Sequence, residues 1–196
     1  MHRLGILVLI GLALQSGALA ASVGFDDFGP GNSYGNSGYT IAYGSSVGDQ
    51  FTTSLTGGLF EIDLAMGYLF GSRDVTVRLL TDSNNSPGSV LESFQLTVTN
   101  DFNSPGSFIP VFSITHPILS VGTDYWLLAT ATNPGSSDVW YVNSANAHGL
   151  RYTDGAITGD WMGTFRVSVA HNPEPATFVL AGAALCLIGR FVRRRA

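Results

Sequence analysis

Between its two ends the chain consists of short runs in which apolar and polar residues alternate. Phe60, Ile62 and Leu64 alternate with Glu61 and Asp63 in a run that continues to residue 68. A period of two is typical of a strand with one buried face, and no stretch keeps the helical period of 3.6 residues over three turns. Further strands are expected at residues 40–43, 50–53, 75–80, 90–99, 108–114, 124–131, 139–142, 149–153 and 164–169.

Turn-forming residues separate these runs. They fill residues 82–88, residues 133–137 and the pair Asp154-Gly155, whereas residues 21–38 predict one strand followed by a Gly/Asn/Ser loop. Strands that follow one another without helices favour an antiparallel β-sandwich over βαβ units. Because few neighbouring runs read as tight hairpins, a jelly-roll or other Greek-key path is favoured over a meander. The predicted class is all-β.

The C-terminal residues combine an apolar segment with a basic end. Residues 176–189 carry no charged side chain. Arginines follow at Arg190, Arg193, Arg194 and Arg195. A helix over residues 176–192 would be about 25 Å long, slightly shorter than the roughly 30 Å hydrocarbon core of a bilayer. Because basic residues remain on the cytoplasmic side, the preceding chain is expected on the far side of a C-terminal transmembrane helix.

Pro173, Glu174 and Pro175 stand directly before this apolar segment. The order of Pro-Glu-Pro, apolar helix and arginine-rich end resembles the PEP-CTERM sorting signal of Gram-negative bacteria. The resemblance implies an inner-membrane intermediate that an exosortase processes, and then a place at the cell surface or outside the cell. It also implies association with exopolysaccharide. A plain C-terminal membrane helix is the alternative.

The first twenty residues predict a secretory signal peptide. A short basic start precedes an apolar core, and Ala18 and Ala20 form an A-x-A cleavage site. We therefore expect delivery through the secretory translocon and three segments: a signal peptide at 1–20, a β-sandwich domain at 21–170 and the sorting signal at 171–196. The only cysteine, Cys186, lies in the apolar tail, so no disulfide is expected within the exported domain.

The exported domain is strongly acidic. Residues 21–172 contain four arginines, no lysine and thirteen acidic residues, a net charge of −9 against −5 for the whole chain. Nucleic acids and anionic lipids are bound through basic surfaces, so neither is an expected partner.

Three stretches of the body resemble the choice-of-anchor domains of bacterial surface proteins, most closely the R type. They are the DQFTT sequence at residues 49–53, the LTD and SPGSVL sequences within residues 80–91, and the LSVGTDYWL sequence at residues 119–127. The resemblance covers residues 39–169 and implies a surface-attached β-domain. That family has no agreed catalytic or ligand-binding residues to carry over.

No complete catalytic set stands out, so an enzyme is not expected. Ser46 lies in a G-x-S-x-G sequence, but a strand is expected after it where a nucleophile elbow needs a helix, which favours a turn. His116, His148 and His171 lack zinc-site spacing and are expected in loops or on the surface. We therefore expect no metal site at the histidines and no catalytic residues.

Acidic pairs leave two alternatives open. Asp26 and Asp27, with loop carbonyls, are candidate ligands for a structural Ca²⁺, the only cofactor considered. Glu61 and Asp63 share the outward face of one predicted strand and would suit a secreted glycoside hydrolase if they flanked a sugar.

Aromatic residues provide candidate carbohydrate contacts at Trp126, Trp140 and Trp161. Tyr125 precedes Trp126 and Tyr141 follows Trp140, so one ring of each pair is expected to face outward, although packing in a sandwich core is the alternative. The resulting hypothesis is a non-enzymatic cell-surface or matrix protein associated with exopolysaccharide. A carbohydrate-binding module is the first alternative, and a secreted hydrolase the second.

Overall fold

The computed structural model describes residues 21–104 and 108–170, so the predicted signal peptide and sorting signal lie outside the described residues. The described chain forms β1 (Ala21–Asp26), a 3-10 helix η1 (Pro30–Asn32), β2 (Tyr34–Ala42), β3 (Val47–Thr52), β4 (Gly57–Leu64), β5 (Met66–Phe70), β6 (Asp74–Asp82), β7 (Pro87–Thr97), β8 (Ile109–Phe112), β9 (Ile118–Leu119), β10 (Asp124–Ala131), β11 (Ser137–Asn143), β12 (His148–Thr153), β13 (Ala156–Trp161) and β14 (Phe165–Ala170). No helix in these two ranges has the length and apolar character to cross a membrane.

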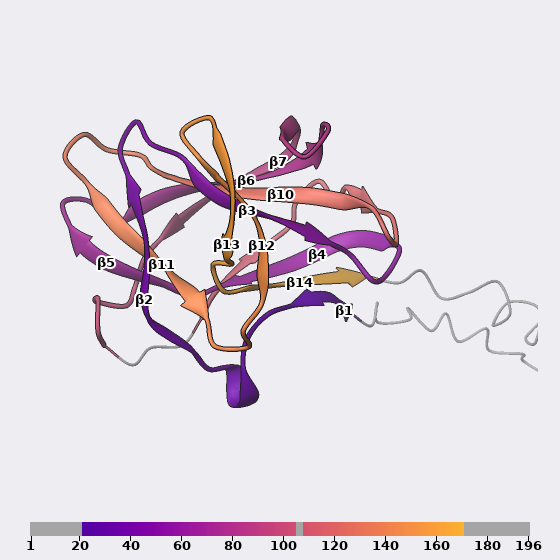
Figure 1. The fold of residues 1–196 in the computed structure, drawn as a ribbon, viewed down its shortest axis with the longest axis horizontal. Helices are drawn as coiled ribbons and strands as arrows, with labels where there is room; N and C mark the ends of the chain where they lie inside the picture. The colour runs from indigo at the N-terminus through magenta and orange to yellow at the C-terminus, as the bar shows by residue number, and fades with distance from the viewer. Residues whose placement is uncertain (1–20, 105–107, 171–196) are drawn as a thin grey trace, which may run out of the picture. The chain divides into compact units, whose positions relative to one another are not determined.

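The strands form three antiparallel sheets (Figure 1). One has the order β1-β14-β4-β8, with β9 also beside β4; the second has the order β13-β12-β3-β10-β6-β7; and the third is β2-β11-β5. Only β6–β7 and β12–β13 pair as sequence neighbours, so the described chain is not a meander. The prediction of an all-β, antiparallel fold is confirmed.

The main core lies between the first two sheets, in a sandwich-like arrangement. Apolar side chains of β4 and β14 on one side meet those of β6 and β10 on the other. The fully buried members include Leu59, Ile62, Leu79, Leu127 and Phe165. Two smaller apolar clusters lie elsewhere, one around Tyr141 and one around Trp126. Some strands are therefore buried on both faces, which simple alternation does not anticipate.

β14 occupies an interior position in the first sheet. It pairs with β1 from Ala21↔Ala170 to Asp26↔Arg166, and on its other side with β4 from Phe165↔Leu64 to Ala170↔Gly58. Residues 21 and 170, where the described chain begins and ends, are thus cross-strand partners in neighbouring strands (Figure 1).

The run expected as one strand at residues 60–68 is two strands in two different sheets. The chain leaves the first sheet after Leu64 and joins the third at Met66. Ala65 between them is fully buried; its N–H donates to the Thr164 carbonyl, and its carbonyl accepts from the Tyr141 N–H. The prediction of a single strand is wrong. The chain changes sheets at Ala65 without interrupting the alternation of apolar and polar residues, so the sequence pattern does not reveal the break.

The Gly/Asn/Ser loop expected before residue 39 is also wrong in part. Residues 34–38 belong to β2 and pair with β11, with Gly38 opposite Tyr141 and Tyr34 opposite Asn143. A Cβ at Gly38 would come close to the Trp140 carbonyl, so this strand needs glycine where the backbones approach. The glycine, asparagine and serine residues that suggested a loop therefore form part of a paired strand.

Candidate functional site

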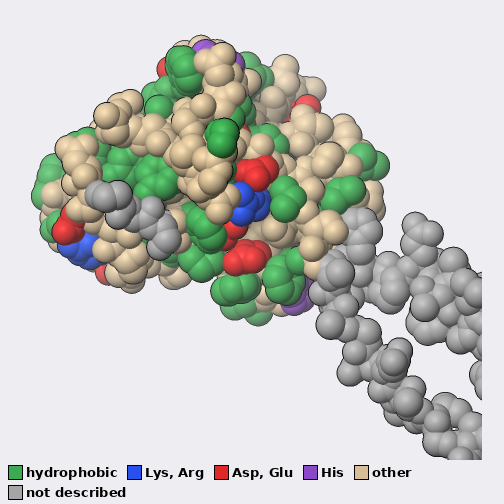
Figure 2. All heavy atoms as spheres, turned by 90° about the horizontal axis from the view of Figure 1, so that it is seen from below, with side chains coloured by type: hydrophobic (Ala, Val, Ile, Leu, Met, Phe, Trp, Pro, Cys, Tyr) green, Lys and Arg blue, Asp and Glu red, His purple; other side chains and the backbone are tan. Residues whose placement is uncertain are grey.

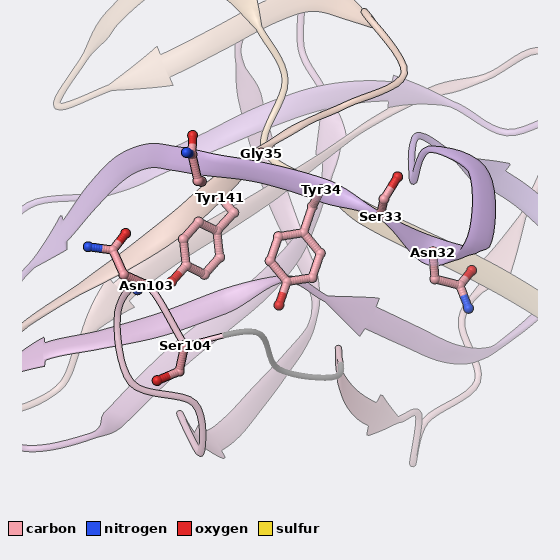
Figure 3. Close-up of a pocket in the computed structure, with 8 residues that line it drawn as sticks. Asn32, Ser33, Tyr34, Gly35, Asn103, Ser104 and Tyr141 are labelled. Carbon is pink, nitrogen blue, oxygen red and sulfur yellow. Dashed lines mark hydrogen bonds between the residues drawn. The ribbon is translucent and has the colours of Figure 1, made fainter.

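A hollow of about 500 Å³ lies beside the start of β2. Its walls come from β2, from residues 103–104 of the connection after β7, and from β11 (Figure 3). The lining residues are Asn32, Ser33, Tyr34, Gly35, Asn36, Asn103, Ser104 and Tyr141. None of these carries a charge, and most bear an amide or a hydroxyl, which both donate and accept hydrogen bonds.

Stacked aromatic rings support one side of the hollow. The rings of Tyr34 and Tyr141 lie with centroids 5.1 Å apart at 28°, and Phe102 stacks on Tyr141 at 6.0 Å and 7°. Phe28 meets Tyr34 edge-on at 6.4 Å. Tyr141 is buried and Tyr34 half-buried, and in Figure 3 both rings reach the same space between Ser33 and Asn103. These contacts hold the rings of Tyr34 and Tyr141 in one orientation.

Hydrogen bonds fix both ends of the hollow. The main-chain N–H of Asn103 donates to the Tyr141 hydroxyl at 3.1 Å. At the other end, the Ser33 and Ser144 hydroxyls lie 2.9 Å apart, and Ser144 also donates to the Ser33 carbonyl at 3.0 Å. Burial raises the pKa of Tyr141, so this hydroxyl stays protonated at neutral pH. These hydrogen bonds hold the main chain at Asn103 and Ser33 in place without a ligand.

A charged cluster occurs next to this hollow but outside its lining. Arg166 of β14 contacts Asp26 at 2.9 Å and Asp63 at 3.4 Å, and it donates to the Asn32 amide oxygen. Figure 2 shows basic and acidic side chains meeting in this way on one face of the molecule, among hydrophobic neighbours. Since Arg166 is satisfied by these partners, it offers little free positive charge to a ligand.

Two of the three predicted carbohydrate contacts are wrong. Trp126 and Trp140 are fully buried, and Tyr125 and Tyr141, the neighbours expected to alternate with them, are buried as well. The Trp126 indole N–H donates to the Asp82 carboxylate at 2.8 Å, and that of Trp140 donates to the Thr164 carbonyl at 3.0 Å. Both rings therefore serve packing.

Additional apolar clusters explain why no ring of these pairs faces solvent. Over β3, Gly48 lies between Leu128 of β10 and Tyr152 of β12 in the strand register. Because Gly48 has no side chain, its neighbours close over the sheet and bury Trp126. Over β11, Phe28 and other aromatic side chains cover Tyr141.

Trp161 is the predicted aromatic contact that does reach the surface. It is 39% exposed and stands at the end of β13, with the His148 ring 4.6 Å from its own. It does not line the hollow. Trp161 therefore remains a separate candidate for carbohydrate contact.

The two candidate calcium ligands point to different surroundings. Asp26 accepts from Arg166 and from the Phe28 N–H, whereas Asp27 is buried and accepts from the Phe165 N–H at 2.7 Å. The Asp26 carboxylate is thus engaged by Arg166 and the Phe28 N–H, and one oxygen of Asp27 by the Phe165 N–H. Within the described ranges no group of three or more His, Cys, Asp or Glu residues is arranged to hold a metal.

Glu61, Asp63 and Ser46 lie outside the described lining of the hollow. Glu61 and Asp63 both lie on β4, but Asp63 is buried against Arg166, and burial raises the pKa of both carboxyls. Ser46 lies in the connection between β2 and β3, 2.8 Å from the Thr130 hydroxyl, and a strand follows it. The strand that the sequence predicts after Ser46 is confirmed.

The histidines lie apart from one another. His116 is in the loop before β9, with Nδ1 2.9 Å from the Leu59 carbonyl oxygen, and His148 begins β12 on the surface. His171 lies outside the described residues.

No family model matches the chain, and no curated protein matches it. Sequence reasoning missed the hollow because its walls come from three separated segments, and Asn32, Ser33 and Asn36 read as an ordinary polar loop. Their occurrence beside an aromatic residue, Tyr34, is the one hint that the sequence carries.

Proposed function

We propose that this chain is an exported, non-enzymatic surface or matrix protein that associates with exopolysaccharide. The proposal includes a jelly-roll or other Greek-key β-sandwich of the choice-of-anchor type, a cleaved signal peptide and a PEP-CTERM-like tail that an exosortase processes. The observation that carries it is the order at the C-terminus, with Pro173-Glu174-Pro175, an uncharged apolar segment and terminal arginines. These three parts would serve in turn as an extended protease substrate, a membrane span and a cytoplasmic stop.

The composition of the body supports the proposal. A domain with a net charge of −9 and no lysine resists nonspecific attachment to nucleic acid and anionic lipid. The uncharged, amide-rich hollow beside Tyr34 favours a carbohydrate partner over an ionic one. This observation also favours the second candidate function, a carbohydrate-binding module.

Processing by an exosortase is the first testable consequence. A copy tagged internally in an exposed turn is expected to be shortened and exported in a host with an exosortase, and to stay at full length in the membrane fraction of an isogenic strain without it. Immunoblots of membrane, surface and medium fractions measure this. Replacing Glu174 by Ala is expected to have the same effect as loss of the enzyme, and equal size and location in both strains would refute the proposal.

Association with exopolysaccharide is the second consequence. The exported protein is expected to sediment with the purified exopolysaccharide of the same host and to stay in solution with an unrelated acidic polysaccharide such as alginate. An equal distribution between pellet and supernatant in both cases would rule out the matrix role while leaving export untouched.

A further inference from the structure

We infer that the hollow beside Tyr34 is a binding site for a neutral saccharide, with Tyr34 as its aromatic platform and Asn36 and Asn103 as its polar contacts. The inference deepens the proposed function by assigning a site and a ligand class, and it rests on that function only for the biological source of the glycan. The uncharged, polar lining of the hollow and its aromatic ring support this assignment.

The charge of the lining excludes the main ionic ligands. A phosphate, sulfate or uronate group needs a cation or a set of aimed N–H donors, and none of the described residues that line the hollow has a basic side chain. The nearby guanidinium of Arg166 is already engaged by Asp26, Asp63 and Asn32. A cationic ligand would need carboxylates, and the lining residues within 21–104 and 108–170 include no aspartate or glutamate.

The polar groups of the lining suit a ligand covered with hydroxyls. Within residues 21–104 and 108–170, the side-chain amides of Asn36 and Asn103 form no hydrogen bond, and both residues are exposed. Each amide offers a donor and an acceptor, as a pair of sugar hydroxyls requires. An apolar ligand would leave these groups without partners after removing their water, which is unfavourable.

The aromatic platform supplies the apolar half of the recognition. A pyranose has a C–H face that packs on an aromatic ring, while its edge carries hydroxyls. Tyr34 is half-buried and held by Tyr141 and Phe28, so its ring is oriented in advance and little ordering is required on binding. Figure 3 shows Asn103 and the Tyr141 ring on one side of Tyr34 and Ser33 and Asn32 on the other, and Tyr34, Asn36 and Asn103 all line the same hollow.

Substitutions that spare the fold can test this assignment. Asn103 has φ +61°, a left-handed conformation that glycine adopts freely, so Asn103→Gly removes the amide and keeps the main-chain bond to Tyr141. Combined with Asn36→Ala, it is expected to weaken binding about tenfold or more. Asn84→Gly is the matched control, because Asn84 is an exposed left-handed asparagine (φ +54°) outside the hollow.

A second pair of variants tests the ring. Tyr34→Leu is expected to weaken binding about tenfold, since a flat aromatic face is lost. Tyr43→Ala replaces a tyrosine that is 52% exposed and outside the hollow, and it should bind as the unaltered protein does. Circular dichroism and the urea midpoint of each variant separate a lost contact from lost folding.

Binding is measured with the full-length chain in mild detergent. The chain is applied to an array of neutral glucans, mannans and galactans together with uronate oligosaccharides. We expect signal on neutral glycans, loss of it in the hollow variants and its retention in the controls Asn84→Gly and Tyr43→Ala, while Trp161→Ala tests the separate candidate contact. Three outcomes would overturn the inference: binding to uronates alone, no binding to any neutral glycan by folded protein, or loss in Trp161→Ala with the hollow variants unchanged. Sedimentation with native exopolysaccharide is scored separately, so failure of the site is distinguishable from failure of the matrix role.

Discussion

Replacing Arg151 by methionine is expected to lower the free energy of unfolding by about 3–5 kcal/mol. Arg151 is almost fully buried; it forms an ion pair with Asp49 at 3.0 Å and donates to the Trp161 carbonyl. Its guanidinium lies 3.0 Å from the centre of the Tyr39 ring. Burial lowers the pKa of Arg151 to about 10, which still leaves it charged at neutral pH. Methionine fills the same space but leaves the Asp49 carboxylate buried without a cation.

Arg73→Met is the matched control for this prediction. Arg73 also combines an aspartate partner (Asp101), main-chain carbonyls and a tyrosine ring, but its side chain is 36% exposed. Exposed ion pairs contribute little, so a loss of roughly 1 kcal/mol or less is expected. Urea unfolding of both variants measures the contrast, and similar losses would contradict it.

Restoring the charge balance is expected to recover part of the loss. Asp49 also accepts the Gly163 N–H at 2.9 Å, and an asparagine oxygen at residue 49 can still accept that bond. The double variant Arg151→Met with Asp49→Asn should therefore be more stable than Arg151→Met alone. The loss in the single variant is also expected to be smaller at pH 5 than at pH 8, because an unpaired buried carboxylate takes up a proton.

Folding is expected to become less stable as the pH rises from about 4 to about 8, because burial raises the pKa of Asp27 and of Asp49. Burial raises the pKa of Asp27 to about 8, although the Phe165 N–H bond acts in the opposite direction. One carboxylate oxygen of Asp27 is buried without a hydrogen-bond partner among the described residues. The folded chain thus holds a proton that the unfolded chain releases near pH 4, and each pH unit in between removes up to about 1.4 kcal/mol.

Asp27→Asn removes the titrating group and is expected to flatten this dependence. The variant should be close to the unaltered protein at pH 4 and more stable than it at pH 8, as judged by urea midpoints at several pH values. Burial also raises the pKa of Asp138, to about 6, so Asp138→Asn should alter the profile only between about pH 4 and 6. Identical profiles for the protein and Asp27→Asn would show that Asp27 ionises normally in the fold.

The sequence predicted strands well where local pattern and local turns agree. Asp154 and Gly155 both have positive φ, as a two-residue hairpin turn requires, and they join β12 to β13 as their sequence indicates. Strand β13 itself was not anticipated, because Ala156, Gly159 and Asp160 weaken its alternation. Hydrogen bonding to β12 stabilises this strand, although its own sequence pattern does not predict it.

Burial of the aromatic residues could not be inferred from alternation. Trp140 faces the main core and Tyr141 faces a second apolar cluster, so both faces of β11 are covered. A period of two tells which residues share a face, but which faces are covered depends on segments far away in sequence. The hollow escaped prediction for the same reason, since Asn36 and Asn103 meet only through the fold.

The interior position of β14 has a mechanical consequence for a chain held by its C-terminal end. Ala170 ends a strand that is bonded to β1 on one side and to β4 on the other. Tension along β14 would load both rows of hydrogen bonds in shear, so that they yield together, whereas an edge strand pulled sideways peels off bond by bond. A domain tethered through this strand is therefore built to withstand drag at the point of attachment.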